Sequence, residues 1–250
     1  MNFKITALAL GLAAMSTFAV SAEEVLPAQK AEIEKIVREY LLKNPEILTE
    51  MAAILELKQK EAEAQARTLA LTTNAGSIFR LPGDAVAGNE KGDVTLVEFM
   101  DYNCGWCKKS VTELSELLAE DKQVRVVFKE MPIFGEGSEY AAKAALAAHK
   151  QDKYWEYHQA LFGYEGQITP AVADEVAVAV GLDLAKMKTD MDDPSILETI
   201  QANQKLAHAL LINGTPAFII DGTLIPGYVN KAKLAEALAG VRSAGGCKIC

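Results

Sequence analysis

Residues 94–107 read Val94-Thr-Leu-Val-Glu-Phe-Met-Asp-Tyr-Asn-Cys104-Gly-Trp-Cys107. The run from Val94 to Met100 is short, apolar and rich in β-branched residues, which predicts a buried strand. Apolar residues then recur at helical spacing from Val111 onward, which predicts a helix. Cys104 therefore precedes a helix N-terminus, where unpaired N–H groups and the helix dipole favour a thiolate. Cys107 follows one turn later, so the two thiols have the spacing needed for thiol–disulfide exchange.

The first 22 residues have the pattern of a secretory signal peptide. Lys4 is their only charge, an apolar run extends from Ile5 to Val20, and the small residues Ser21 and Ala22 follow. We expect cleavage after Ala22, because the apolar run is short for a membrane anchor. The formal net charge of the whole chain is −9, which argues against a nucleic-acid partner.

A second Cys-x-x-Cys pair, Cys247 and Cys250, ends the chain. Export places all four cysteines in an oxidising compartment. A zinc site shared by the two pairs is the structural alternative, but the pairs lie much further apart in sequence than those of a zinc ribbon. The three histidines show no metal-ligand spacing, so no metal site is predicted.

Residues 28–73 are predicted to be helical, with a break at Asn44-Pro45. The apolar stripe along these helices has no evident core to pack on, so we expect self-association through it. The alternatives are an arm folded back on the main domain and a simple spacer.

The remaining elements alternate between strand and helix. We expect a short first strand at 77–81, a loop at 82–92, and a strand at 124–131 that completes a parallel strand–helix–strand unit. Residues 138–212 are predicted to be a helical insertion. A hairpin of strands 217–220 and 223–226 follows Thr215-Pro216, and a final helix covers 231–241.

This order resembles the thioredoxin fold, and with the insertion it resembles the DsbA family of bacterial periplasmic thiol–disulfide oxidoreductases. The arm is similar to that of the suppressor-of-copper-sensitivity C and Com1-type oligomeric subgroup. The resemblance predicts an α/β fold, a thioredoxin fold with a helical insertion, preceded by an N-terminal helical oligomerisation arm. The expected divisions are a signal peptide (1–22), the arm (23–75), the thioredoxin-like domain (76–242) and a flexible tail (243–250).

The resemblance also implies roles for individual residues. Cys104 would be the nucleophile, Cys107 the resolving cysteine and Glu98 a buried acid beneath them; an ordinary surface carboxylate is the alternative for Glu98. Gly105, Trp106, Thr215 and Pro216 would bind substrate, with a cis bond before Pro216. Cys247 and Cys250 would be a second redox pair, either a labile local disulfide or a relay to Cys104, or else a disposable tail.

The direction of the reaction follows from the residues between the cysteines. Strongly oxidising members of the family have a His between the cysteines, whereas Gly105-Trp106 offers no charge or strong donor to Cys104, so we expect a less stabilised thiolate and a less oxidising protein. The resemblance to isomerases with Gly-Tyr and Thr-Pro favours a disulfide isomerase or reductase. A DsbA-type dithiol oxidase and a Cu(I)-binding copper-tolerance protein are the alternatives.

The expected partners are exported proteins with thiols or disulfides, a membrane redox partner, and further copies of the chain bound through residues 28–73. No cofactor is expected, and the expected location is the periplasm.

Overall fold

A computed structural model describes residues 27–250 of the chain; the predicted signal peptide lies outside the described residues. The contacts divide the chain into two units, one ending at Gln59 and the other comprising Lys60–Cys250. The elements follow in the order α1 (Pro27–Lys43), α2 (Glu46–Thr73), α3 (Ala75–Phe79), β1 (Ala85–Gly88), β2 (Val94–Met100), α4 (Gly105–Glu120), β3 (Val124–Glu130), α5 (Glu136–His149), α6 (Tyr154–Gly163), α7 (Pro170–Ala179), α8 (Leu184–Met191), α9 (Pro194–Ala209), β4 (Ala217–Ile220), β5 (Thr223–Pro226) and α10 (Lys231–Ser243).

The break between α1 and α2 falls at Asn44-Pro45, as predicted. Pro45 carries no N–H to continue the first helix, and the Asn44 side chain turns back to donate to the Tyr40 carbonyl at 2.8 Å. Large apolar side chains in the first unit are exposed, among them Ile36 at 58% and Ile54 at 55%. Within this unit, the apolar stripe therefore has no covering layer.

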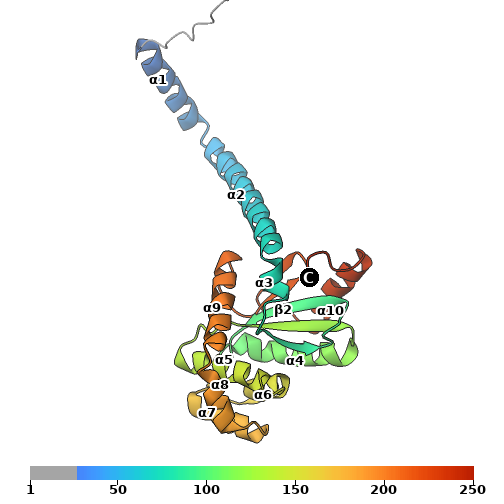
Figure 1. Ribbon diagram of the computed structural model, residues 1–250. Helices are drawn as coiled ribbons and strands as arrows, with labels where there is room; N and C mark the ends of the chain where they lie inside the picture. The colour runs from blue at the N-terminus through green and yellow to red at the C-terminus, as the bar shows by residue number, and fades with distance from the viewer. Residues whose placement is uncertain (1–26) are drawn as a thin grey trace, which may run out of the picture. The chain divides into compact units, whose positions relative to one another are not determined.

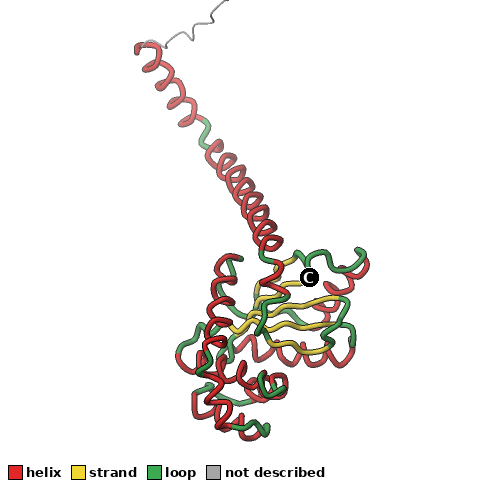
Figure 2. Tube along the Cα trace, in the orientation of Figure 1, coloured by secondary structure: helices red, strands yellow, loops and turns green. Residues whose placement is uncertain are grey.

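The second unit is built on a five-stranded sheet of order β1-β3-β2-β4-β5 (Figure 2). The central pair, β2 and β3, is parallel, which confirms the predicted strand–helix–strand unit. Strand β4 pairs antiparallel with the other side of β2, bringing Ala217 opposite Phe99. Asp221 and Gly222 join β4 to β5 in the predicted hairpin.

Alternation along β2 sends side chains into two cores, one on each face of the sheet. Leu96 and Met100 pack with α4, α10 and the helices of the insertion. Val97 and Phe99 pack on the other face with α3, the last turn of α2 and the end of α9. Helices thus cover both faces of the sheet (Figure 1), and the insertion α5–α9 occupies the predicted place between β3 and β4.

Two predictions about the start of the domain are wrong. The segment expected to be a strand at 77–81 is helix α3, and the first strand is β1, inside the expected loop at 82–92. Ile78 and Phe79 are both fully buried in the same core, an arrangement that a strand could not give to adjacent residues. Strand β1 has a weak side-chain signal and is held by its pairing with β3. It ends at Gly88 (φ +80), where an added Cβ would meet the Val124 carbonyl oxygen at 2.5 Å.

Candidate active site

Cys104 is the residue that caps the N-terminus of α4, with extended backbone angles of φ −83° and ψ 116°. Its N–H donates to the Asp101 carbonyl at 3.1 Å, which closes the turn leading out of β2. The Cys104 side chain is nearly buried, and Cys107 lies beneath it in the first turn of α4. The structure thus brings the predicted nucleophile and resolving cysteine together at a helix start, and both are free thiols.

The peptide bond between Thr215 and Pro216 is cis, as predicted. The Cys104 thiol donates to the Thr215 carbonyl oxygen, with Sγ and O 3.2 Å apart. The pairing of β4 with β2 causes this contact, because it sets the residues just before Ala217 beside the end of β2. Sheet pairing therefore joins two sequence motifs separated by more than one hundred residues.

The pKa values of the two thiols move in opposite directions. A hydrogen bond from Cys107 lowers the pKa of Cys104 to about 5; the Thr215 side chain and the N–H groups of Cys107 and Trp106 act in the same direction, against the cost of burial. Burial raises the pKa of Cys107. The expectation that Cys104 has no strong donor nearby is therefore wrong, while a thiolate less stabilised than that of the strongly oxidising family members stays a prediction. The donors come from Cys107 and the helix backbone, which the identity of residues 105 and 106 does not reveal.

Glu98 lies in the middle of β2 and is 2% exposed, so it is not a surface carboxylate. The Ser110 hydroxyl, on α4, donates to its Oε1 at 2.7 Å. Burial raises the pKa of Glu98 to about 8, with the Ser110 hydrogen bond opposing the shift and the charge of Cys104 adding to it. A carboxyl with this pKa can exchange a proton near neutral pH.

Gly105 and Trp106 form the exposed rim beside Cys104. An added Cβ at Gly105 would meet nothing within 4 Å, and Trp106 is 55% exposed. The Trp106 ring lies 5.5 Å from that of Tyr228, and the Lys109 ammonium sits 4.4 Å from the Trp106 ring centroid. An open apolar surface therefore adjoins the buried sulfur.

Two polar residues that hold the cysteine loop were missed in the sequence. The carboxylate of Asp101 accepts from the N–H of Asn103 at 2.7 Å, from the N–H of Ile133 at 2.6 Å and from the Ser138 hydroxyl at 2.7 Å. The Asn103 amide donates to the Ile168 carbonyl at 3.1 Å and accepts from the Ile168 N–H at 2.8 Å. Their only signal in the sequence is their position directly before Cys104.

A buried polar cluster also went unpredicted. Glu130 Oε1 accepts from Tyr154 at 2.8 Å and from Tyr102 at 3.2 Å, and the Tyr102 hydroxyl lies 3.1 Å from His158 Nδ1. Burial raises the pKa of Glu130 and lowers that of His158 to about 3. Burial therefore disfavours the charged forms of Glu130 and His158, and the cluster ties the loop before Cys104 to the insertion.

The tail lies apart from this site. Cys247 and Cys250 form a disulfide, the N–H groups of Lys248 and Ile249 both donate to Asp221 at 2.9 Å, and Arg80 donates to the Cys250 carbonyl. Asp221 follows the end of β4 that is remote from Pro216. The local disulfide that is one of the two predictions for this pair is present in the structure. The other prediction, a free tether that reaches Cys104, is wrong in this structure, because hydrogen bonds hold the tail at the opposite end of the sheet.

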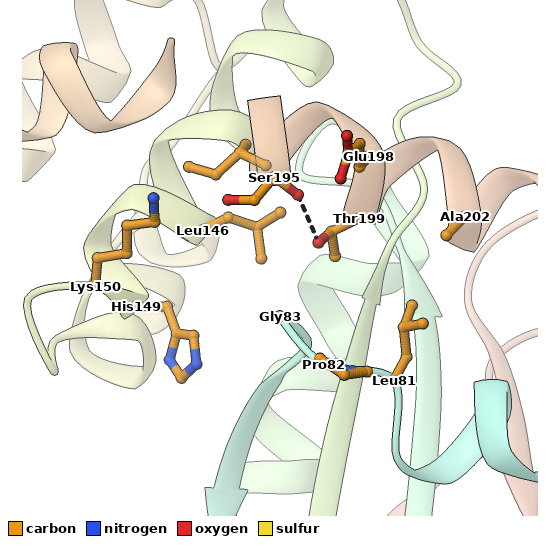
Figure 3. A pocket seen from close by; sticks show the side chains of 11 residues that line it. Leu81, Pro82, Gly83, Leu146, His149, Lys150, Ser195, Glu198, Thr199 and Ala202 are labelled. Carbon is orange, nitrogen blue, oxygen red and sulfur yellow. Dashed lines mark hydrogen bonds between the residues drawn. The ribbon is translucent and has the colours of Figure 1, made fainter. Parts of the chain in front are cut away.

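A cleft of about 520 Å³ lies between the loop at Leu81–Gly83, α5 and α9 (Figure 3). His149, Lys150 and Glu198 are among its lining side chains, and Thr199 donates to the Ser195 carbonyl at its edge. None of the predicted site residues lines it. The candidate active site is accordingly the shallow surface around Cys104 and not this cleft.

A paired cysteine site at a helix N-terminus, facing a cis-proline on this sheet, defines a thiol–disulfide oxidoreductase of the thioredoxin fold. Residues 95–239 match the family described as DSBA-like thioredoxin domain, and the chain belongs to this family. Residues 29–62 match a second family, described as the copper resistance protein ScsC N-terminal domain. These matches confirm the family resemblance and the fold predicted from the sequence.

Solved structures agree with this assignment. A thioredoxin-like oxidoreductase from Silicibacter pomeroyi DSS-3 is 42% identical, with a TM-score of 0.66, and the match covers 67% of this chain and 97% of that one. Proteus mirabilis ScsC in a transitional conformation is 31% identical, with a TM-score of 0.64, over 85% of this chain and 96% of that one.

Curated relatives include much longer proteins. The Na(+)/H(+) antiporter NhaA 1 of Salinispora arenicola is 30% identical over 165 residues, which are 64% of this chain and 25% of the antiporter. The chain thus spans about a quarter of that relative's length, so the name of the relative says nothing about transport by this chain.

Proposed function

We propose that the protein exchanges disulfides in exported proteins and acts as a disulfide isomerase or reductase. The observation that carries the proposal is the contact between Cys104 Sγ and the Thr215 carbonyl beside cis-Pro216, with Cys107 buried below. This contact places a thiol of low pKa beside the exposed backbone at Thr215, along which an extended substrate segment can lie.

The exchange begins when the Cys104 thiolate attacks one sulfur of a substrate disulfide. A Cys104–substrate disulfide forms, and the other substrate sulfur leaves as a thiolate. In isomerisation, a substrate thiolate attacks the mixed disulfide and restores the Cys104 thiolate. In reduction, Cys107 gives its proton to Glu98 and attacks Cys104, which releases the reduced substrate and leaves a Cys104–Cys107 disulfide.

Glu98 suits the second route because the pKa of Cys107 is raised by burial. A buried thiol of this kind needs a nearby proton acceptor, and Glu98, with a pKa of about 8, lies against the same helix turn through Ser110. Thr215, Pro216, Gly105 and Trp106 would contact the substrate segment around its cysteine.

The arm supports an assembly of several sites. The exposed stripe of residues 28–73 and the match to the ScsC N-terminal domain favour homo-oligomers through this arm. Several Cys104 sites held together would suit the reshuffling of misfolded substrates, in which more than one disulfide must be broken.

The second candidate is a dithiol oxidase of the DsbA type, favoured by the pKa of about 5 at Cys104. A stabilised thiolate stabilises the reduced enzyme and so makes its disulfide a stronger oxidant. A pKa of about 5 for Cys104 lies between the approximate values of 7 for thioredoxin and 3.5 for DsbA.

A third candidate is Cu(I) binding. Asp221, Cys247 and Cys250 could together hold a metal ion, and thiolates suit Cu(I). These cysteines would first have to be reduced, because their disulfide offers no thiolate. Stoichiometric Cu(I) binding without any isomerisation of scrambled ribonuclease would favour this candidate over the enzyme.

We place the protein in the periplasm, exported by a cleaved signal peptide, where a membrane redox partner would set the state of Cys104 and Cys107. The support is the N-terminal sequence pattern and the family. Among the helices within residues 27–250, none has the length and hydropathy needed to cross a membrane.

A redox titration of Cys104 and Cys107 against glutathione, together with refolding of scrambled ribonuclease, tests the proposal. A reduction potential of about −180 mV or below, with ribonuclease reactivation, is the expected result. A potential of about −120 mV, with fast oxidation of reduced peptides and no ribonuclease reactivation, would favour the oxidase over the isomerase.

A further inference from the structure

A second, smaller cleft of about 290 Å³ adjoins the cis-proline. Its wall is formed by residues 211–217, by the β5 side of the hairpin and by Arg67 near the end of α2. Thr215, whose carbonyl accepts from the Cys104 thiol, belongs to this wall. The wall of the cleft therefore contacts the reacting sulfur of Cys104 through Thr215.

Arg67 is the charged residue among those that line the cleft. Its Nε is buried and has no hydrogen-bond partner. The described arginines elsewhere in this unit do have acceptors: Arg80 donates to Cys250, Arg125 to Phe79, and Arg242 to Asp93 and Asp121. An arginine at a cleft wall with no acceptor is a binding group for an anion that the chain itself does not supply.

Thr215 links the cleft to the reacting sulfur. Its side chain acts on the Cys104 sulfur and lowers the pKa of that thiol. Burying a polar group without a partner costs free energy, so the unpaired Nε of Arg67 in the wall of this cleft indicates a ligand that supplies an acceptor. An extended peptide segment offers backbone groups to a hydroxyl and a side-chain carboxylate to a guanidinium.

We infer that Arg67 is a specificity-determining residue that binds an acidic side chain of the substrate near its reacting cysteine. The inference rests on the proposed function, because it assigns the substrate class of the same site. The favoured substrates are extended segments with Asp or Glu within a few residues of cysteine. The carboxylate would pair with Arg67 while the backbone of the segment reaches Thr215.

The test uses the reduced full-length chain and a set of synthetic peptides. Each peptide has one cysteine, blocked as a mixed disulfide with 2-mercaptoethanol, and carries Glu at one flanking position; matched peptides carry Gln or Lys there. We expect kcat/KM for the best-placed Glu peptide to exceed that of its Gln partner by about threefold to tenfold. Arg67→Gln should abolish this preference, and Arg67→Glu should shift it toward Lys.

The matched control is Lys91→Gln, which removes the same charge from an exposed loop before β2, at the other end of the sheet. It should retain the Glu preference. Equal rates for Glu and Gln peptides at every position, or a preference that survives Arg67→Gln, would overturn the assignment of Arg67.

Reduction of bis(2-hydroxyethyl) disulfide, which is small and uncharged, separates this inference from the proposed function. Wild type and Lys91→Gln should reduce it at the same rate. If wild type reduces this disulfide but shows no charge preference among the peptides, only the role of Arg67 is refuted. If wild type reduces neither kind of disulfide, the proposed function is refuted as well.

Discussion

The reactivity of the site depends on the uncharged hydrogen-bonding groups around the Cys104 sulfur. No charged side chain is among the main causes of its lowered pKa; Cys107 is the first of these causes, followed by Thr215 and two backbone N–H groups. The helix N-terminus supplies donors that do not depend on which residues stand between the cysteines. The stabilisation of Cys104 is thus a property of its position.

Replacing Cys107 by Ala removes the largest of these causes. We expect the pKa of Cys104 to rise by about one unit or more, measured from the ultraviolet absorbance of the thiolate during a pH titration. Cys107→Ser is the control, because a hydroxyl can still donate and should keep the pKa lower than in the Ala variant. Equal pKa values in the two variants would assign the effect to the backbone alone.

Glu98 links stability to pH. Its pKa is raised from 4.5 to about 8 in the folded state, so the folded protein binds the proton more tightly than the unfolded chain does. The stabilisation of the folded state by this bound proton is fully present below about pH 4.5 and is lost as the pH rises through 8. Glu98→Gln should therefore flatten the decline in the free energy of unfolding across this window, measured by urea denaturation.

The same variant also tests the role of Glu98 in the reaction. Resolution of a Cys104 mixed disulfide by Cys107 should slow near neutral pH, because the amide cannot take the proton. Ser110→Ala keeps the carboxyl and should leave resolution faster than in Glu98→Gln. A resolution rate unchanged by Glu98→Gln would give Glu98 a structural role only.

The hairpin turn between β4 and β5 fixes the position of the C-terminal tail. Asp221 accepts hydrogen bonds from two N–H groups of the disulfide loop, and Ile249 and Cys250 pack against the core that includes Phe79 of α3. Strand β4 has 4 residues and lies between this turn and Pro216. At about 3.3 Å for each residue, its length keeps the tail too far from Cys104 for direct exchange.

Replacing both Cys247 and Cys250 by Ser should consequently leave the potential of Cys104 and Cys107 and the turnover rate unchanged. The free energy of unfolding should fall by about 2 kcal/mol or less, because the closed loop is short. Asp221→Ala is the matched variant, since it releases the tail while keeping the cysteines. A shifted potential in the double Ser variant alone would restore the electron relay predicted from the sequence.

For the molecule as a whole, the proposed role of the arm is to bring several Cys104 sites together. Ile36→Asp combined with Ile54→Asp places charges on the exposed stripe without disturbing a buried core. We expect a change from oligomer to monomer by light scattering and a loss of ribonuclease reactivation, with reduction of small disulfides retained. Lys35→Asp, on the same helix as Ile36, is the control. An unchanged mass in the double variant would contradict the proposed role of the arm.

Patterns local in sequence were readable without a structure. The strand before Cys104, the helix after it, the break at Asn44-Pro45 and the hairpin at Asp221-Gly222 each depend on neighbouring residues, and each was predicted correctly. Strand β1 was not, because an Ala-rich tetrapeptide becomes a strand only when β3 is present to pair with it.

The class of redox site was predictable from neighbouring residues, since two thiols one turn apart at a helix start suffice for disulfide exchange. The electrostatics of the site depend on the packed fold. Burial sets the pKa of Glu98 and Cys107, sheet pairing brings Thr215 to Cys104, and the end of α2 brings Arg67 to the same cleft. Desolvation and long-range contacts arise only when the chain is packed, so neighbouring residues in the sequence cannot reveal them.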